Sequence, residues 1–316
     1  MKHLRFLLVL VLLVTVAIPV FAQDFGLSGE DSALLNEAVN NSTAADSLRY
    51  EFTAVVTASG VDSSDLNLNV SGSGVISSDA LSMIVDGTIE ASGETIPAAL
   101  EVRFVNETFY LGLAGQWFSA TPDELTNLGS AVGGQAGLPI DPSALAGGDM
   151  SGMAGMEGMG DLMTSLAELD PATFISQSRL ADAGGDAVFQ TAFDVEMLFS
   201  TPAFGQLFAM GMAQGSASAG GEMTPEQAEM MAQMIGVMFA DAEFTFDQFV
   251  NVETRTVSSA VLSLNLPLEG LVGQPGAGLT VELTVDLSGY NEPVSVEVPA
   301  DAQPLSQAMG AMMGSM

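Results

Sequence analysis

Hydrophobic and polar residues alternate along the first half of the chain in five successive segments. They lie at about 48–59, 66–75, 80–91, 95–106 and 108–114. A period of two is typical of β-strands that bury one face. Ser-Asp and Ser-Gly pairs between the segments favour turns. The pattern therefore predicts a five-stranded antiparallel meander over this stretch.

The hairpin over 98–121 is the clearest of these predictions, because its two strands meet at the polar pair Asn106-Glu107. On the strands, Val102, Phe104, Thr108 and Tyr110 alternate with Glu101, Arg103, Phe109 and Leu111. Glu101 and Arg103 share a face, so their charges can neutralise each other. The single tryptophan, Trp117, follows beside Phe118, and we expect both to form an aromatic cluster with Phe109 and Tyr110.

Helical periodicity precedes the meander and returns after it. A helix is expected over 32–45, capped by Ser32 and with an apolar stripe of Leu34, Leu35, Ala38 and Val39. Further helices are expected at 161–169, 171–178, near 202–214 and at 224–240, and strands at 187–195, 243–250, 254–266, 279–287 and 294–298. This order predicts an α+β fold: a strongly curved antiparallel sheet (half-barrel) with helices packed in its concave face.

The N-terminus has the features of a secretory signal peptide. A basic start is followed by an apolar run over 6–16, and small residues precede Gln23. Pro19 and the Val-Phe-Ala ending favour cleavage after residue 22 over the alternative, a membrane anchor. We therefore expect an exported, periplasmic or extracellular protein that is soluble and not membrane-anchored after cleavage.

The expected mature chain begins with a short tail over 23–31, followed by a single domain over 32–305. Residues 306–316 are interpreted as a flexible C-terminal tail. Within the domain, the stretch at about 128–160 is rich in Gly, Ala, Ser and Met and is interpreted as a flexible loop.

Acidic residues outnumber basic ones by 39 to 6, which gives a net charge of −33. Such a surface repels nucleic acid and anionic membranes. Beyond residue 22 the chain has no lysine, histidine or cysteine. This excludes a Ser-His-Asp or Cys-His device, a Schiff-base lysine, and zinc bound through imidazole or thiolate. Acid pairs such as Asp241 and Glu243 have no active-site context, so we expect neither enzymatic activity nor a cofactor.

Four stretches carry a resemblance to a known family. They are SLRYEFTAVVTASG after the opening helix, the hairpin EVRFVNETFYLGLAGQWF, DAVFQTAFDVEML after the central helices, and the ending YNEPVSVEVPADAQPL. Over roughly 34–305 the chain resembles the exported lipid and lipoprotein carriers of the LolA and LppX/LprG type. The resemblance implies a half-barrel sheet over a helical lid, an apolar cavity that holds acyl chains, and no catalysis. Many relatives carry a lipobox cysteine, which this chain lacks.

A hydrophobic ligand, the acyl chain of a lipid or lipoprotein, is therefore expected between the sheet and the helices. Cavity-lining candidates are Tyr110, Trp117 and Phe118 on the hairpin, and Met230, Met234 and Met238, which lie four residues apart on one face of the helix at 224–240. Core packing is the alternative for both sets.

A methionine repeat leaves a second function open. Met150, Met153, Met156 and Met159 recur at every third residue, and thioethers can bind Cu(I). The alternative is an adaptable, weakly apolar lid. A third hypothesis is an envelope scaffold that binds a protein partner and no lipid.

Overall fold

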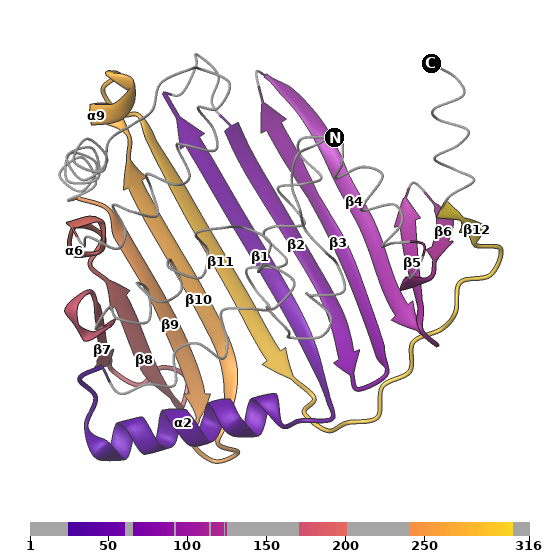
Figure 1. The fold of residues 1–316 in the computed structure, drawn as a ribbon, viewed down its shortest axis with the longest axis horizontal. Coiled ribbons are helices and arrows are strands. Elements are labelled where there is room, and N and C mark those ends of the chain that lie inside the picture. The colour runs from indigo at the N-terminus through magenta and orange to yellow at the C-terminus, as the bar shows by residue number, and fades with distance from the viewer. Residues whose placement is uncertain are drawn as a thin grey trace, which may run out of the picture.

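The computed structural model describes residues 25–60, 66–91, 93–113, 115–122, 124, 171–200 and 241–305. They form one large, open, curved sheet of twelve strands (Figure 1). The strands are β1 (Ser47–Ser59), β2 (Leu66–Ser77), β3 (Ala80–Ala91), β4 (Glu94–Val105), β5 (Thr108–Leu113), β6 (Gln116–Ala120), β7 (Ile175–Arg179), β8 (Asp186–Phe193), β9 (Glu243–Asn251), β10 (Thr256–Pro267), β11 (Gly278–Ser288) and β12 (Gln303–Pro304). The helical elements are α2 (Gly29–Thr43), η2 (Pro171–Thr173), α6 (Val195–Ser200) and α9 (Glu269–Val272).

The order across the sheet is β12-β6-β5-β4-β3-β2-β1-β11-β10-β9-β8-β7. The meander predicted over 48–114 is confirmed as β1 to β5, and β6 continues it. The second half of the chain starts at the opposite edge with β7 and returns strand by strand until β11 pairs with β1. Neighbouring strands are antiparallel except β12, which pairs in parallel with β6.

Helix α2 begins at Gly29, three residues before the predicted start. The cap is Ser28 rather than Ser32, because the Ser28 hydroxyl accepts a hydrogen bond of 3.2 Å from the amide of Asp31. Acidic residues in the first turn favour this start electrostatically. The predicted apolar stripe is confirmed, since it packs on β8, β9 and β10 in one buried cluster of Leu27, Leu35, Ala38, Val39, Ala187, Phe189, Val250 and Val257.

Two predicted elements are wrong. The helix expected over 171–178 is only the 3-10 turn η2, and strand β7 follows it at the edge of the sheet. Pairing with β8 here overrides the local helical signal. The strand expected over 294–298 is irregular, since Pro293 and Pro299 flank it and lack the amide donors that a ladder needs. The predicted helices at 161–169, 202–214 and 224–240 lie outside the described residues.

The hairpin turn at Asn106 and Glu107 is confirmed, and both residues have positive φ angles (53° and 57°), as tight hairpins require. The side-chain alternation predicted across it is wrong. With a two-residue turn, Phe104 lies opposite Phe109 and Arg103 opposite Tyr110. Residues directly opposite each other share a face, so the two phenylalanines lie on one face and Arg103 and Tyr110 on the other.

Residues 289–302, here called the C-terminal strap, run from the end of β11 along one end of the sheet to β12 (Figure 1). Its start is fixed by Asn291, whose amide donates to the carbonyl of Ser47 at 2.9 Å. Further along, Nη1 of Arg103 donates to the carbonyl of Glu297 at 2.8 Å. The strap thus joins the middle of the sheet to its β6 edge.

All four arginines in the described part of the chain hold segments outside the sheet against it. Arg179 and Arg255 bind the α2 carboxylates of Asp31 and Glu37. Arg49 lies 3.8 Å from Glu292 in the strap, and Arg103 binds the strap backbone.

Candidate ligand-binding face

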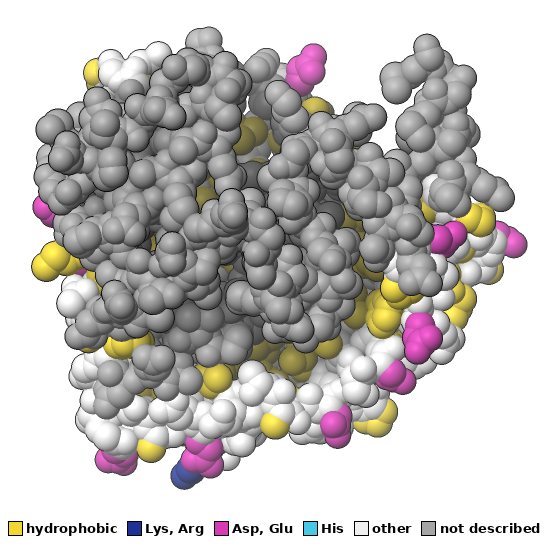
Figure 2. All heavy atoms as spheres, in the orientation of Figure 1, with side chains coloured by type: hydrophobic (Ala, Val, Ile, Leu, Met, Phe, Trp, Pro, Cys, Tyr) yellow, Lys and Arg dark blue, Asp and Glu magenta, His cyan; other side chains and the backbone are white. Residues whose placement is uncertain are grey.

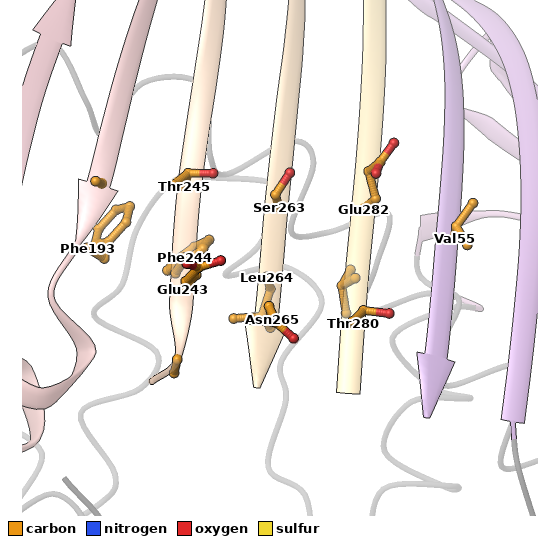
Figure 3. Close-up of a pocket in the computed structure, with 13 residues that line it drawn as sticks. Val55, Phe193, Glu243, Phe244, Thr245, Ser263, Leu264, Asn265, Thr280 and Glu282 are labelled. Atoms are coloured by element: carbon orange, nitrogen blue, oxygen red, sulfur yellow. The ribbon is translucent and has the colours of Figure 1, made fainter. Parts of the chain in front are cut away.

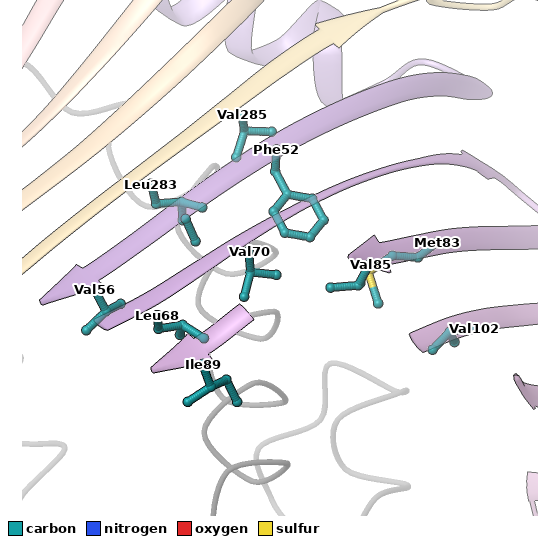
Figure 4. Packing of buried hydrophobic residues seen from close by; sticks show 11 residues of the cluster. Phe52, Val56, Leu68, Val70, Met83, Val85, Ile89, Val102, Leu283 and Val285 are labelled. Atoms are coloured by element: carbon teal, nitrogen blue, oxygen red, sulfur yellow. The ribbon is translucent and has the colours of Figure 1, made fainter. Parts of the chain in front are cut away.

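One face of the sheet is apolar over most of its width, and we call it the apolar face. Its buried residues are Phe52, Ala54, Val56, Leu68, Val70, Met83, Val85, Ile89, Val102, Leu283 and Val285 (Figure 4). Partly buried hydrophobic residues pack around them, among them Leu81, Leu100, Leu262 and Val281. The opposite polar face carries hydroxyl, amide and carboxylate side chains such as Thr53, Ser71 and Asp86. Figure 2 shows hydrophobic side chains over the sheet and acidic side chains along its lower rim.

Strand register sorts the apolar face into rows that cross the sheet. One row runs from β9 to β4 through Gln248, Ala260, Val285, Phe52, Gly72, Val85 and Leu100. The next row runs through Phe246, Leu262, Leu283, Ala54, Val70 and Gly87. Strands lie about 4.8 Å apart, so the six intervals from β9 to β4 span roughly 29 Å. The face is therefore a continuous apolar surface of molecular length.

Two glycines of β2 make room for aromatic rings of β1. A Cβ added to Gly72 would lie 2.5 Å from the ring of Phe52, and one on Gly74 would lie 2.5 Å from the hydroxyl of Tyr50. The rings thus lie over the backbone of β2, where any side chain would displace them. Burial in this setting raises the pKa of Tyr50 to about 12.

The apolar face has a polar end on β7, β8 and β9. Gln177, Thr191 and Gln248 point to this face and are buried, the last two being only 1% exposed. Gln177 Nε2 donates to the Thr191 hydroxyl at 3.1 Å. Within the part of the chain that the structure describes, Oε1 of Gln248 accepts no hydrogen bond. Such unsatisfied buried acceptors are rare and costly.

Arg179 lies beside this polar end, on the edge strand β7. Its guanidinium donates to Asp31 at 2.8 Å and to Asp182 at 2.6 Å, and it lies 5.0 Å from the ring centroid of Phe189. The hydrogen bond to Asp182 raises the pKa of Arg179 above its ordinary value, with Asp31 contributing in the same direction. Because two carboxylates already neutralise it, Arg179 offers no free charge to an anionic ligand.

The predicted aromatic cluster is divided between the two faces. Phe118 pairs with Leu111 and so lies on the apolar face, near the edge of the sheet. Tyr110 and Trp117 lie on the polar face, where the Arg103 guanidinium lies 4.8 Å from the Trp117 ring centroid. The division follows from the two-residue turn at 106–107, since side chains alternate from that fixed point.

The seven methionines named by the two sequence hypotheses are not among the residues that the structure describes. Met230, Met234 and Met238 lie outside the described residues, as do Met150, Met153, Met156 and Met159 of the Cu(I) hypothesis. The apolar-face residues that the sequence hypothesis did not single out are those of the central strands. Phe52, Val70 and Val85 had a detectable signal, because each lies in an alternating segment of the meander.

Pockets lined by described residues also open on the polar face. One has a volume of about 580 Å³ near the ends of β8 to β11, where Thr245, Ser263 and Glu282 lie side by side (Figure 3). A second, of about 380 Å³, is lined by Glu51, Asp86 and Asp286 among others. Among the described residues, no group of three or more acids has a geometry that could hold a metal ion. The polar face has the composition of a solvated surface.

Comparisons with known proteins give structural similarity only. No protein-family model matches the chain, and no curated protein matches its sequence. The chain is similar to LprF from Mycobacterium bovis, with 13% identity, a TM-score of 0.34, and 86% of this chain and 98% of LprF covered. It is also similar to a lipovitellin chain described for its lipid–protein interactions, with 9% identity and a TM-score of 0.28. That match covers 81% of this chain but 26% of the lipovitellin chain. Both TM-scores lie below 0.5, so these similarities assign no family and carry no argument about a ligand.

Among the described residues, no helix is both long and apolar enough to cross a membrane.

Proposed function

We propose that this protein is an exported, non-catalytic carrier that holds an acyl chain or similar hydrophobic ligand against the apolar face, between the curved sheet and its helices. The observation that carries the proposal is the extent of that face. Helix α2 packs mainly on β9 and β10, whereas the apolar rows continue across β11 and β1 to β4. Most of the apolar face therefore lies beyond the reach of α2.

The edge of this surface is open. Ile96 on β4 lies opposite the buried Ile89, so it belongs to the apolar face, yet it is 45% exposed. An exposed apolar residue at the edge of a larger, buried apolar face offers an apolar ligand a place to enter. Each methylene of an acyl chain that leaves water here contributes about 0.8 kcal/mol. A chain laid along the rows would gain this energy repeatedly.

A matched pair of isoleucines tests which face binds. Ile96 on the apolar face and Ile84 on the polar face are both 45% exposed and lie on adjacent strands. We expect Ile96→Asp to weaken binding of a fluorescent fatty acid by at least tenfold, because it places a charge against the ligand. Ile84→Asp adds the same charge to the solvated face and should leave binding unchanged.

Native mass spectrometry of the mature protein from its own host, followed by organic extraction, completes the test. A discrete adduct of lipid mass, reduced by Ile96→Asp and retained by Ile84→Asp, is the expected result. A bare polypeptide that also fails to bind the fluorescent fatty acid would reject the carrier and favour the scaffold hypothesis.

A further inference from the structure

The carrier proposed above needs a means of orienting its ligand, and the polar end of the apolar face supplies one. Gln248 lies on the same row as Val285 and Phe52, separated from them by Ala260. Alanine is the smallest side chain of that row apart from Gly72. A ligand lying along the row would therefore approach the Gln248 amide directly from the apolar side.

The Gln248 amide is held in an unusual environment for a polar group. It is 1% exposed, lies opposite Phe189 on one side and Ala260 on the other, and is flanked along β9 by Phe246 and Val250. Its Oε1 has no hydrogen-bond partner within the described part of the chain. A buried acceptor without a donor destabilises the protein, and a ligand that brings the donor removes that cost.

The neighbouring groups do not supply this donor. Thr191 lies diagonally across from Gln248, and its hydroxyl accepts from Gln177 Nε2 at 3.1 Å but forms no hydrogen bond with Oε1 of Gln248. Arg179 directs its Nη1 and Nη2 groups at Asp31 and Asp182, and its buried Nε forms no hydrogen bond with Gln248. No described side chain donates to Oε1 of Gln248, so a ligand that enters along the row can supply the donor.

We propose that Gln248 accepts a hydrogen bond from the hydroxyl of an amphiphilic ligand, whose apolar chain then extends along the rows toward β4. This inference rests on the proposed function and adds a chemical class, a hydroxyl-bearing lipid, and a direction of binding. A hydroxyl suits the site better than an anion because no free cation faces Gln248 from β7, β8 or β10 among the described residues. It also suits either orientation of the amide, since a hydroxyl both donates and accepts.

Two probes of equal carbon number, each with one double bond, compare a ligand that carries a hydroxyl with one that does not: oleyl alcohol and 1-octadecene, each competing with a fluorescent fatty acid. Gln248→Met keeps the length of the side chain and removes its hydrogen-bonding atoms. The variant should lose about tenfold in affinity for oleyl alcohol, equivalent to 1.4 kcal/mol, and bind 1-octadecene as well as before. The matched control is Gln190→Met, which changes a glutamine on the polar face of β8 that donates to Asp247 at 3.0 Å. It should alter neither affinity.

A second measurement uses the unchanged protein. The side-chain amide resonance of Gln248 should shift when oleyl alcohol is added and stay in place with 1-octadecene. An unshifted resonance together with equal effects of Gln248→Met on both probes would overturn the inference and assign the amide to core packing or to a buried water. The carrier function would survive that result, because both probes would still bind. Failure of both probes to bind the unchanged protein would reject the carrier function and this inference with it.

Discussion

Replacing Gly72 with alanine tests the packing that builds the apolar face. The added Cβ would lie 2.4 Å from the carbonyl oxygen of Ile84 and 2.5 Å from the ring of Phe52. Ordinary contacts of a Cβ begin near 3.4 Å, so β3 or the ring must move by about 1 Å. Overpacking of this kind costs about 1–3 kcal/mol. We expect about 3 kcal/mol here, because one of the two clashes is with backbone.

The matched control is Gly29→Ala at the first position of α2. A Cβ there meets nothing within 4 Å. The substitution should raise the free energy of unfolding by about 0.5 kcal/mol, because alanine has less conformational entropy than glycine in the unfolded chain. Both variants are measured by urea unfolding, followed by far-UV circular dichroism. Combining Gly72→Ala with Phe52→Leu should recover about 1 kcal/mol relative to the sum of the single variants, because the ring clash is removed.

If Gly72→Ala unfolded at the same urea concentration as Gly29→Ala, the ring of Phe52 could not lie over β2 as described. The rows of the apolar face would then be wrongly assigned at their centre. A large loss with no coupling to Phe52 would instead place the whole penalty on the backbone of Ile84. These outcomes separate the ring packing from the strand register.

Three further predictions concern charges at defined positions. Arg179→Leu should lower the free energy of unfolding by about 1–2 kcal/mol in the same urea experiment, because two carboxylates lose their partner and an aromatic contact is lost. Arg49→Leu is the control and should lower it by at most about 0.5 kcal/mol, because the Arg49 side chain is 48% exposed and that of Arg179 only 28%. Burial raises the pKa of Tyr50 to about 12 in the folded protein, from its ordinary value of 10.0 in the unfolded chain. The neutral Tyr50 side chain therefore contributes its full stabilisation below pH 10. This contribution, up to roughly 2–3 kcal/mol, is lost as the pH rises through 12. Thermal unfolding between pH 9 and 12 should show this fall in the unchanged protein and a smaller one in Tyr50→Phe. Glu51 and Asp286 lie directly opposite each other on β1 and β11, so Asp286→Asn should raise stability by about 0.5 kcal/mol at low salt, and a gain that persists in 1 M salt would contradict the electrostatic reason.

The meander was predictable because its signal is local. Each of its strands alternates in sequence and ends at a turn, and β1 to β5 pair only with neighbours in the chain apart from the outer edge of β1. Strand β7 was not predictable in this way. Its residues carry a helical start signal at Asp170-Pro171, and the pairing with β8 that overrides it is a tertiary interaction.

The candidate site was predictable in kind but not in detail. An apolar face follows from alternation alone, yet its rows depend on the register between strands far apart in sequence, such as β1 and β11. The prediction of one aromatic cluster was wrong because the two-residue turn decides which side chains share a face. No local pattern in the sequence predicts the polar end of the apolar face. Gln177, Thr191 and Gln248 come from three strands, and only their register brings them together.

The distribution of arginine explains how so acidic a chain keeps its non-sheet segments in place. A chain with a net charge of −33 repels itself, and the repulsion acts on segments held by few apolar contacts before it acts on the sheet. The C-terminal strap is such a segment, whereas α2 also packs through a buried apolar cluster, and each of the two is held by two of the four described arginines. The sheet needs no such help, because its strands are joined by continuous ladders and a buried core. Added salt therefore has two opposite effects on stability. It reduces the repulsion among acidic side chains across the whole surface, and it weakens the exposed ion pairs of Arg49 and Arg255. The apolar face, which depends on neither pair, is the part of the molecule whose shape salt should change least.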